Sequence, residues 1–260
     1  GADAIGMVEK TSVDGDTVSI ETQVEPGNHI RPAGDDVVEG DLVFPSGTEL
    51  SAGHLGLLCS LGLHEIETYP RLRVGVISTG DELVDDGGPL APGQIRDSNR
   101  RTLLSLLSGD GFEPGDLGLI ADDELAIETA LVQGAQNCDA VVTSGGVSMG
   151  DFDYVKAVLD RIGDMRWMQV AIKPAKPLAF GTIEGTPIFG LPGNPVSSMV
   201  SYELFARSGL RSMMGFPQPV RPVVQAVAAN PLTRRIDGKI HYAAVLAKHE
   251  DGKTVVIPVS

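Results

Sequence analysis

The chain has 260 residues, of which 42% are hydrophobic, and it carries a formal net charge of −15 with a pI of about 4.6. The hydrophobic content is sufficient for a sizeable core, and the acidic balance argues against nucleic acid or an anionic membrane as the main partner, because there is no basic surplus to displace phosphate counterions. No apolar run has the length of a membrane helix, and the two cysteines, Cys59 and Cys138, each lie in an apolar stretch, so we expect reduced core thiols and a cytoplasmic protein.

Residues 1–45 carry strand signals and no helix of any length. Two strands are predicted at 4–8 and 17–20, the second of them directly after the turn Asp14-Gly15-Asp16, and together they indicate part of a small β-rich region. A loop rich in proline, glycine and charge follows at 25–36, and its composition fits either a linker or a functional edge. A helix is predicted at 48–62, within a helical linker region at 46–70.

Residues 71–215 alternate short apolar runs with helical patterns. Strands are predicted at 73–77, 117–120, 140–142 and 187–191, and helices at 98–108, 123–136, 152–162 and 195–208. This rhythm predicts a three-layer α/β/α sandwich with a mostly parallel sheet. An insertion at 167–183 contains Pro174 and Pro177, which exclude a long helix, so a hairpin or an extended arm is expected.

The last segment, 216–260, is predicted to be a small β domain. It begins with the proline-containing linker 216–219, and strand patterns follow at 223–227, 240–246 and 255–259. The sequence therefore predicts an α/β domain flanked by a β-rich region on the N-terminal side and a β domain on the C-terminal side.

Acidic and glycine-rich turns follow the four predicted strands. Because ligands of parallel α/β sheets bind at the carboxyl ends of the strands, we expect these turns to meet at one edge of the sheet. The turns contain Asp81 and Glu82, then Asp122 and Asp123, then Gly145 and Gly146 followed by Asp151 and Asp153 near a helix start, and finally Pro192, Gly193, Asn194 and Pro195. Carboxylates could bind a divalent cation there while backbone N–H groups bind phosphate. Asp122 and Asp123 could equally be helix caps.

Two proline-rich segments and one polar turn supply further candidates. In the turn after the fourth strand, Asn194 is expected to cap a helix whose first residue is Pro195, and the flanking prolines indicate a rigid loop against a ligand. Lys173 and Lys176 each precede a proline, which suits ammonium groups aimed at a phosphate or oxyanion, although a solvated turn is the alternative. Asp97 is expected to face the site, and Ser98 or Asn99 to cap the next helix.

Several common sites are unsupported. The five histidines show no metal-ligand spacing, which argues against a zinc site. The sequence also lacks the hydrolase motif GxSxG, the P-loop lysine motif and a GxGxxG after a strand.

Six segments together resemble the MoeA family, the molybdopterin molybdenumtransferases, which includes the C-terminal domain of gephyrin. They occur in the family's order and are IRPAGDDV at 30–37, ISTGDELV at 77–84, IRDSNR at 95–100, TSGGVSMGDFDYV at 143–155, AIKPAKPLAFG at 171–181 and GLPGNPVSS at 190–198. The family's Asp-Gly-Tyr/Phe-Ala and Gly-Ser-His motifs are absent, as expected of a chain that begins inside the first β-rich domain and stops inside the last.

The resemblance implies a Mg²⁺-dependent step of molybdenum cofactor synthesis. Molybdenum from molybdate would be inserted into adenylylated molybdopterin with release of AMP. The implied metal ligands are Asp81, Glu82, Asp122 and Asp153, and Asp36 would join this catalytic group. The implied substrate contacts are Gly145, Gly146 and Ser148 at the pterin phosphate, Lys173 and Lys176 as positive charges, the turn Pro192, Gly193, Asn194 and Pro195, and also Asp97 and Ser98.

The resemblance also implies a homodimer, with the molybdopterin adenylyltransferase as a possible partner. Two alternatives stay open: an adenylyltransferase or CinA-type relative that shares the α/β domain, and a non-catalytic scaffold such as gephyrin. The loop at 30–37 and the turn at 192–195 favour the molybdenum-inserting enzyme over the first alternative. The charged residues Asp81, Glu82, Asp153 and Lys173 argue against a purely structural role.

Overall fold

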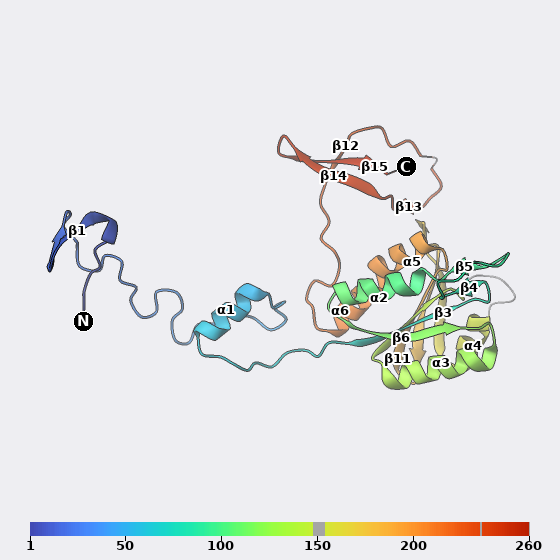
Figure 1. Cartoon of the computed structure of the whole chain (residues 1–260). Helices are drawn as coiled ribbons and strands as arrows, with labels where there is room; N and C mark the ends of the chain where they lie inside the picture. Colours follow the sequence, from blue (N-terminus) through green and yellow to red (C-terminus); the bar gives the residue numbers. More distant parts are fainter. Residues whose placement is uncertain (148–153, 235, 260) are drawn as a thin grey trace. The chain divides into compact units, whose positions relative to one another are not determined.

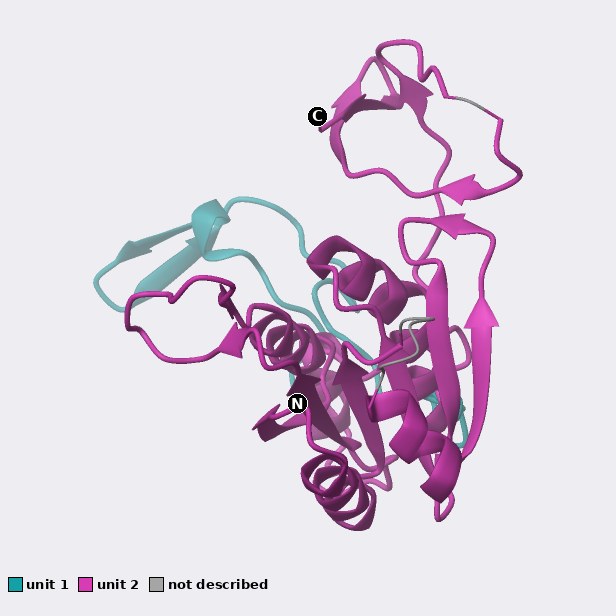
Figure 2. Cartoon of the chain, turned by 90° about the vertical axis from the view of Figure 1, so that its right-hand side faces the viewer, with its two compact units in different colours: residues 1–48 teal, residues 49–260 magenta. Residues whose placement is uncertain are grey.

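The computed structural model describes residues 1–147, 154–234 and 236–259. The chain divides into two compact units, Gly1–Thr48 and Glu49–Ser260 (Figure 2). Among the described residues, no helix is both long and apolar enough to cross a membrane.

The first unit contains a short hairpin. A 3-10 turn, η1 (Val8–Lys10), leads into β1 (Thr11–Asp14), which pairs antiparallel with β2 (Thr17–Ile20). Gly15 lies in the connecting turn with a φ of 57°, a conformation that glycine adopts without strain. The second strand was predicted correctly, but the strand predicted at 4–8 is wrong, because the hairpin turn selects the partner directly before it, at residues 11–14.

The second unit begins with helix α1 (Ala52–Ser60), which is shorter than predicted. Its N-cap is Ser51, whose backbone N–H donates to His54 Nδ1 over 3.0 Å, and the helix ends before Gly62, which has a φ of 74°. Cys59 is an exposed residue of this helix, so its prediction as a core residue is wrong. Leu58 is the buried side chain of α1.

A six-stranded sheet forms the centre of this unit, and it confirms the predicted mostly parallel α/β fold. Its order is β6 (Glu113–Ile120), β3 (Arg73–Thr79), β7 (Ala140–Ser144), β11 (Thr186–Leu191), β10 (Pro177–Ile183) and β8 (Asp164–Gln169). The first four strands are parallel, and β10 runs antiparallel to both β11 and β8. The insertion after the third predicted strand is therefore a hairpin inside the main sheet, and not an arm.

Helices cover both faces of the sheet (Figure 1). One face carries α2 (Asn99–Gly109), α5 (Pro195–Ser201) and α6 (Arg207–Met213), and the other carries α3 (Glu124–Asn137) and α4 (Tyr154–Ile162). The alternation along β7 explains the two cores, since Ala140 and Val142 point to the α2 side and Val141 points to the α3 side. The predicted start of α4 at residue 152 lies outside the described residues.

The helix predicted at 195–208 continues to Met213. It is interrupted by the π-helical turn η2 (Tyr202–Ala206). Within this turn Tyr202 is fully buried, and its hydroxyl donates to Asp110 Oδ2 over 2.9 Å, while Arg207 Nε donates to Asp110 Oδ1 over 2.9 Å. These buried contacts hold the helix beyond the end that periodicity predicted.

The C-terminal residues form short strands. A three-stranded sheet contains β12 (Val227–Ala228), β15 (Lys253–Pro258) and β14 (Val245–Glu250). The strand predicted at 223–227 is wrong except for its last residue, and the one predicted at 240–246 is two strands, because β13 (Ile240–His241) pairs instead with β9 (Ile172–Lys173). A further small pair joins β4 (Leu83–Val84) and β5 (Ile95–Arg96).

The order of the parallel strands defines where a ligand can enter. The chain passes from β3 to β6 on one side, and then returns across β3 to β7 on the other side. The loops after β3 and β7 therefore leave the sheet in opposite directions. Ligands of open α/β sheets bind at such a switch point, outside the carboxyl ends of the strands.

Candidate active site

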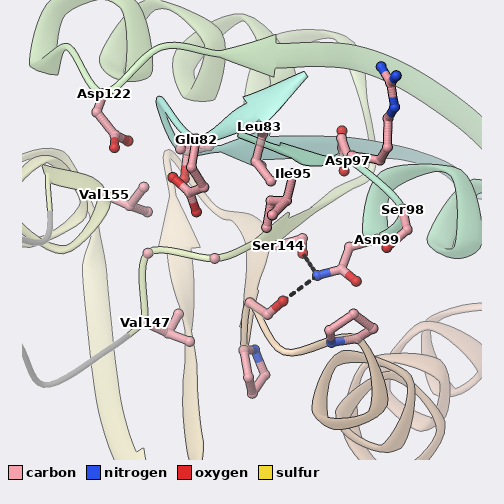
Figure 3. A pocket seen from close by; sticks show the side chains of 18 of the residues that line it. Glu82, Leu83, Ile95, Asp97, Ser98, Asn99, Asp122, Ser144, Val147 and Val155 are labelled. Carbon is pink, nitrogen blue, oxygen red and sulfur yellow. Dashed lines mark hydrogen bonds between the residues drawn. The ribbon is translucent and has the colours of Figure 1, made fainter. Parts of the chain in front are cut away.

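A pocket of about 620 Å³ lies at this switch point (Figure 3), a size that suits a small organic ligand. Its walls are the segments that follow β3, β6, β7 and β11, together with the β4 and β5 pair and the start of α2. The apolar part of the lining includes Leu83, Ile95, Val147 and Val155. The polar part includes Thr79, Glu82, Ser98, Asn99, Asp122 and Ser144.

The glycine turn after β7 forms one wall. Gly145 and Gly146 have φ values of 94° and 71°, in the left-handed region that favours glycine. A side chain at residue 146 would also place its Cβ 2.3 Å from Val155 Cβ, and Val155 is almost fully buried. The Gly145 N–H donates to the Leu191 carbonyl over 3.0 Å, which joins this turn to the end of β11.

Carboxylates occupy the other side of the pocket. Glu82 and Asp122 both line it, and Figure 3 shows them on the side opposite Asn99. Asp81 does not line the pocket. Instead its Oδ1 accepts from the Asp122 N–H over 3.1 Å, and its own N–H donates to Asp122 Oδ2 over 3.3 Å. This reciprocal pair joins the segments after β3 and β6.

The environment of Asp122 disfavours its negative charge. Burial raises the pKa of the Asp122 carboxyl, and the nearby Asp81 and Glu82 carboxylates raise it further, against the hydrogen bond from the Asp81 N–H, which lowers it. Asp123 has a different role, because it is the N-cap of α3 and accepts from the Ala126 N–H over 2.8 Å. The structure thus separates two adjacent aspartates that the local sequence pattern left equivalent.

The acids of this wall can be compared with what Mg²⁺ requires. The described part of the chain brings no group of three or more acidic, histidine or cysteine side chains together at metal-binding distance, and the predicted ligand Asp153 lies outside it. However, Mg²⁺ is usually held by one or two carboxylates, waters and the phosphates of a substrate. Glu82 and Asp122, which both face the pocket, fit that requirement.

Asp97 anchors the start of α2. Its side chain is buried, and its two oxygens accept from Ser78 Oγ over 3.0 Å, from the Arg100 N–H over 3.2 Å and from Arg100 Nε over 2.8 Å. Arg100 is itself buried and also bonds to Asp85 and Asp116. Although Asp97 borders the pocket, its oxygens are engaged by the protein. Ser98 lines the pocket at the N-cap position of α2 and makes no capping bond there.

The turn after β11 supplies the pocket's third wall. Pro192, Gly193 and Pro195 line the pocket. Asn194 does not, because its side chain caps α5 and accepts from the Ser197 N–H over 3.3 Å. Pro195 occupies the first turn of that helix, as the sequence predicted.

The remaining predicted residues lie elsewhere. Lys173 and Lys176 are exposed, and neither contributes to the pocket lining. Asp36 belongs to the first unit, where its carboxylate pairs with Arg31. Ser148 and Asp153 fall outside the described residues.

Sequence reasoning missed the role of Asn99. It was considered only as a helix cap, but its Nδ2 donates to Ser144 Oγ over 2.8 Å and to the Gly193 carbonyl over 2.7 Å. The signal was its place within the segment IRDSNR. A side-chain amide at the first turn of a helix, beside two strand-end turns, can donate two hydrogen bonds at once.

Comparisons with known proteins find family matches for two segments of the chain. Residues 75–212 match the family described as a probable molybdopterin binding domain, and residues 1–62 match the MoeA N-terminal region, domains I and II. The chain is 40% identical over 243 residues to the molybdopterin molybdenumtransferase of Haemophilus influenzae, covering 93% of this chain and 60% of that protein. It is 40% identical over 261 residues to molybdopterin molybdenumtransferase 2 of Mycobacterium tuberculosis, covering 98% and 64%.

A solved structure shares the fold. The molybdopterin biosynthesis moeA protein of Pyrococcus horikoshii aligns with a TM-score of 0.72 at 28% identity, over 98% of this chain and 62% of that one. The chain thus spans less than two thirds of the length of these relatives.

Proposed function

The chain belongs to the MoeA family of molybdopterin-binding proteins, and on that premise we propose that it contributes the binding and reaction pocket of a molybdopterin molybdenumtransferase. The observation that carries the proposal is the switch-point pocket, which combines a glycine turn with the Glu82 and Asp122 carboxylates. Adenylylated molybdopterin and molybdate are the proposed substrates, and molybdenum-loaded molybdopterin and AMP the proposed products.

The proposed roles follow from the walls of the pocket. Gly145 and Gly146 let the backbone approach a phosphate without side-chain bulk. Leu83 and Ile95 provide an apolar surface for a flat ring, beside the rigid turn formed by Pro192, Gly193 and Pro195. Within this proposal, Ser148 extends the phosphate site, Asn194 holds the rigid turn, and Asp97 and Ser98 border the substrate.

The same proposal assigns the charged residues. Glu82 and Asp122 hold Mg²⁺, with Asp153 as a further ligand and Asp81 fixing the position of Asp122. When bound, Mg²⁺ supplies positive charge that offsets repulsion between the anionic substrates. Lys173 and Lys176 add positive charge, and Asp36 is a further catalytic candidate that rests on the family resemblance alone.

The proposal also covers the oligomeric state, the cellular location and the source of the substrate. The family resemblance supports a homodimer in the cytoplasm that receives its substrate from the molybdopterin adenylyltransferase. The match of residues 1–62 to the MoeA N-terminal region favours this function over that of a relative with the α/β domain alone. Sedimentation of the purified protein tests the dimer, and a monomer at micromolar concentration would contradict it.

A direct assay tests the proposed reaction. The purified protein is given Mg²⁺, molybdate and adenylylated molybdopterin, and we expect molybdate-dependent release of AMP. Glu82→Gln should abolish the release and leave the thermal unfolding transition intact. Glu113→Gln is the matched control, since Glu113 is exposed at the opposite end of the parallel sheet. An intact protein that releases no AMP would contradict the proposed function and favour a scaffold.

A further inference from the structure

We propose that Asn99 is a positioning residue that holds the two turns of the pocket wall in their ligand-binding arrangement. One turn begins at Ser144, the last residue of β7, and continues through Gly145. The other follows β11 and contains Gly193. The Asn99 side chain bonds to both, and it reaches them from a third element, the start of α2.

The chemistry of the acceptors fixes the orientation of the amide. The Gly193 carbonyl can only accept a hydrogen bond, so the group 2.7 Å away must be the amide nitrogen and not the amide oxygen. The second hydrogen of the same nitrogen is then directed at Ser144 Oγ, 2.8 Å away. Both donors of the Asn99 amide are therefore used to bridge the two turns (Figure 3).

Buried residues close to Asn99 in the sequence fix the position of its backbone. Asp97 and Arg100 are buried and bonded to each other, and Asp97 also accepts from Ser78 of β3. These contacts thus fix the position from which the Asn99 side-chain amide reaches the two turns. Side-chain hydrogen bonds and the short backbone segment 97–100 therefore connect β3 to the end of β7 and to the turn after β11, and β7 and β11 are neighbouring strands of the sheet.

This arrangement makes a specific prediction about binding. If the bridge is lost, the two turns spend part of the time apart, and the apparent dissociation constant of a ligand rises by the inverse of the fraction that remains competent. Every bound molecule still occupies the competent arrangement, so the chemical step is unaffected. Loss of Asn99 should therefore raise KM and leave kcat nearly unchanged.

Hydrogen exchange tests the bridge without any ligand. The Gly145 N–H donates to the carbonyl of Leu191, the last residue of β11, so it joins the points where the same two turns begin and reports on their separation. In Asn99→Ala and in Asn99→Asp, which has the same shape but lacks the donors, we expect its exchange to accelerate at least about tenfold. Asn137→Ala is the control, because Asn137 also donates to a backbone carbonyl but is exposed at the end of α3. Unchanged exchange at Gly145 in the Asn99 variants would overturn the proposal.

The kinetic arm rests on the proposed function. In the AMP-release assay we expect both Asn99 variants to raise KM for adenylylated molybdopterin about tenfold and to change kcat by less than about twofold. A fall in kcat with unchanged KM would overturn the positioning role. A wild-type protein that releases no AMP would instead overturn the proposed function, and hydrogen exchange would still decide whether Asn99 bridges the turns.

Discussion

Asp122 shows at the level of one residue how a binding site lowers the stability of its own fold. Its carboxyl is partly buried near Asp81 and Glu82, and its pKa is raised. A raised pKa means that the folded state binds this proton more tightly than the unfolded state does. The protonated Asp122 carboxyl therefore makes its full contribution to stability below the unfolded pKa of about 3.9. That contribution is lost as pH rises through the higher pKa of the folded state, where the carboxyl becomes charged.

Removing this charge should stabilise the protein in the absence of metal. Asparagine keeps an oxygen that can accept the Asp81 N–H. We expect Asp122→Asn to raise the free energy of unfolding at about pH 7 by up to about 0.5 kcal/mol, and the gain to vanish below about pH 4. Urea unfolding at both pH values measures this. A variant that is less stable than wild type at the higher pH would show that the hydrogen bond outweighs the repulsion.

Gly146 allows the strain of a turn to be separated from the crowding of its neighbours. In Gly146→Ala, the left-handed backbone costs about 1–2 kcal/mol, and the contact with Val155 adds to it. Gly185→Ala is the control, since its φ of 88° is similar and, apart from its two chain neighbours, no residue has an atom within 4 Å of the added Cβ. We expect the residue 146 variant to lose at least about 1 kcal/mol more in chemical unfolding. Equal losses would mean that Val155 moves aside freely.

Ion pairs of a buried arginine hold the start of helix α2 in place. Arg100 is 3% exposed and bonds to Asp97, Asp85 and Asp116, which come from three different segments. Arg100→Met would leave Asp97 buried without its cation, and such a loss costs about 3–5 kcal/mol. The adjacent Arg101 also pairs with Asp85, but its side chain is 61% exposed.

The contrast between these two arginines is measurable. We expect Arg101→Met to cost less than about 1 kcal/mol, because exposed ion pairs contribute little. The free energies of unfolding of both variants provide the test. A loss below about 1 kcal/mol for Arg100→Met would show that Asp97 finds water or another donor once the arginine is removed.

The elements that were predictable from the sequence are those whose local signals agree with their packing. The β7 strand and α3 fall in this class, because an apolar run and a capped helical period each have one solution. The β8 and β10 hairpin was one of two predicted alternatives, and the sequence did not choose between them for a physical reason. Prolines argue against a sheet interior, but Pro177 is the first residue of β10, a position that strands tolerate.

The features of the pocket that the sequence could not predict have a similar physical origin. Asp122 and Asp123 have the same local sequence context, and only the direction of each side chain decides that one caps α3 and the other faces the pocket. The bridge made by Asn99 depends on residues 45 and 94 positions away along the chain. No local pattern encodes such a distance. The sequence could place the strand ends on one edge, but not the contacts between them.

At the scale of the whole molecule, the net charge of −15 opposes compaction, so any salt should stabilise the fold by screening. A bound Mg²⁺ should add a contribution beyond screening. A site with a dissociation constant of about 1 mM adds about 1.4 kcal/mol at about 10 mM Mg²⁺. Comparing MgCl₂ with NaCl at equal ionic strength isolates that contribution, and chelation should remove it.

The acidic wall predicts which variants lose the Mg²⁺ contribution. Glu82→Gln and Asp122→Asn remove carboxylates that face the pocket, so their thermal unfolding should respond to MgCl₂ no more than to NaCl of equal ionic strength. Asp160→Asn is the control, because its carboxylate accepts from Trp167 Nε1 on the outer face of α4 and does not line the pocket. This variant should keep the full Mg²⁺ response. If all three variants kept it, the cation would bind elsewhere on the acidic surface, and the assignment of Glu82 and Asp122 as its ligands would be wrong.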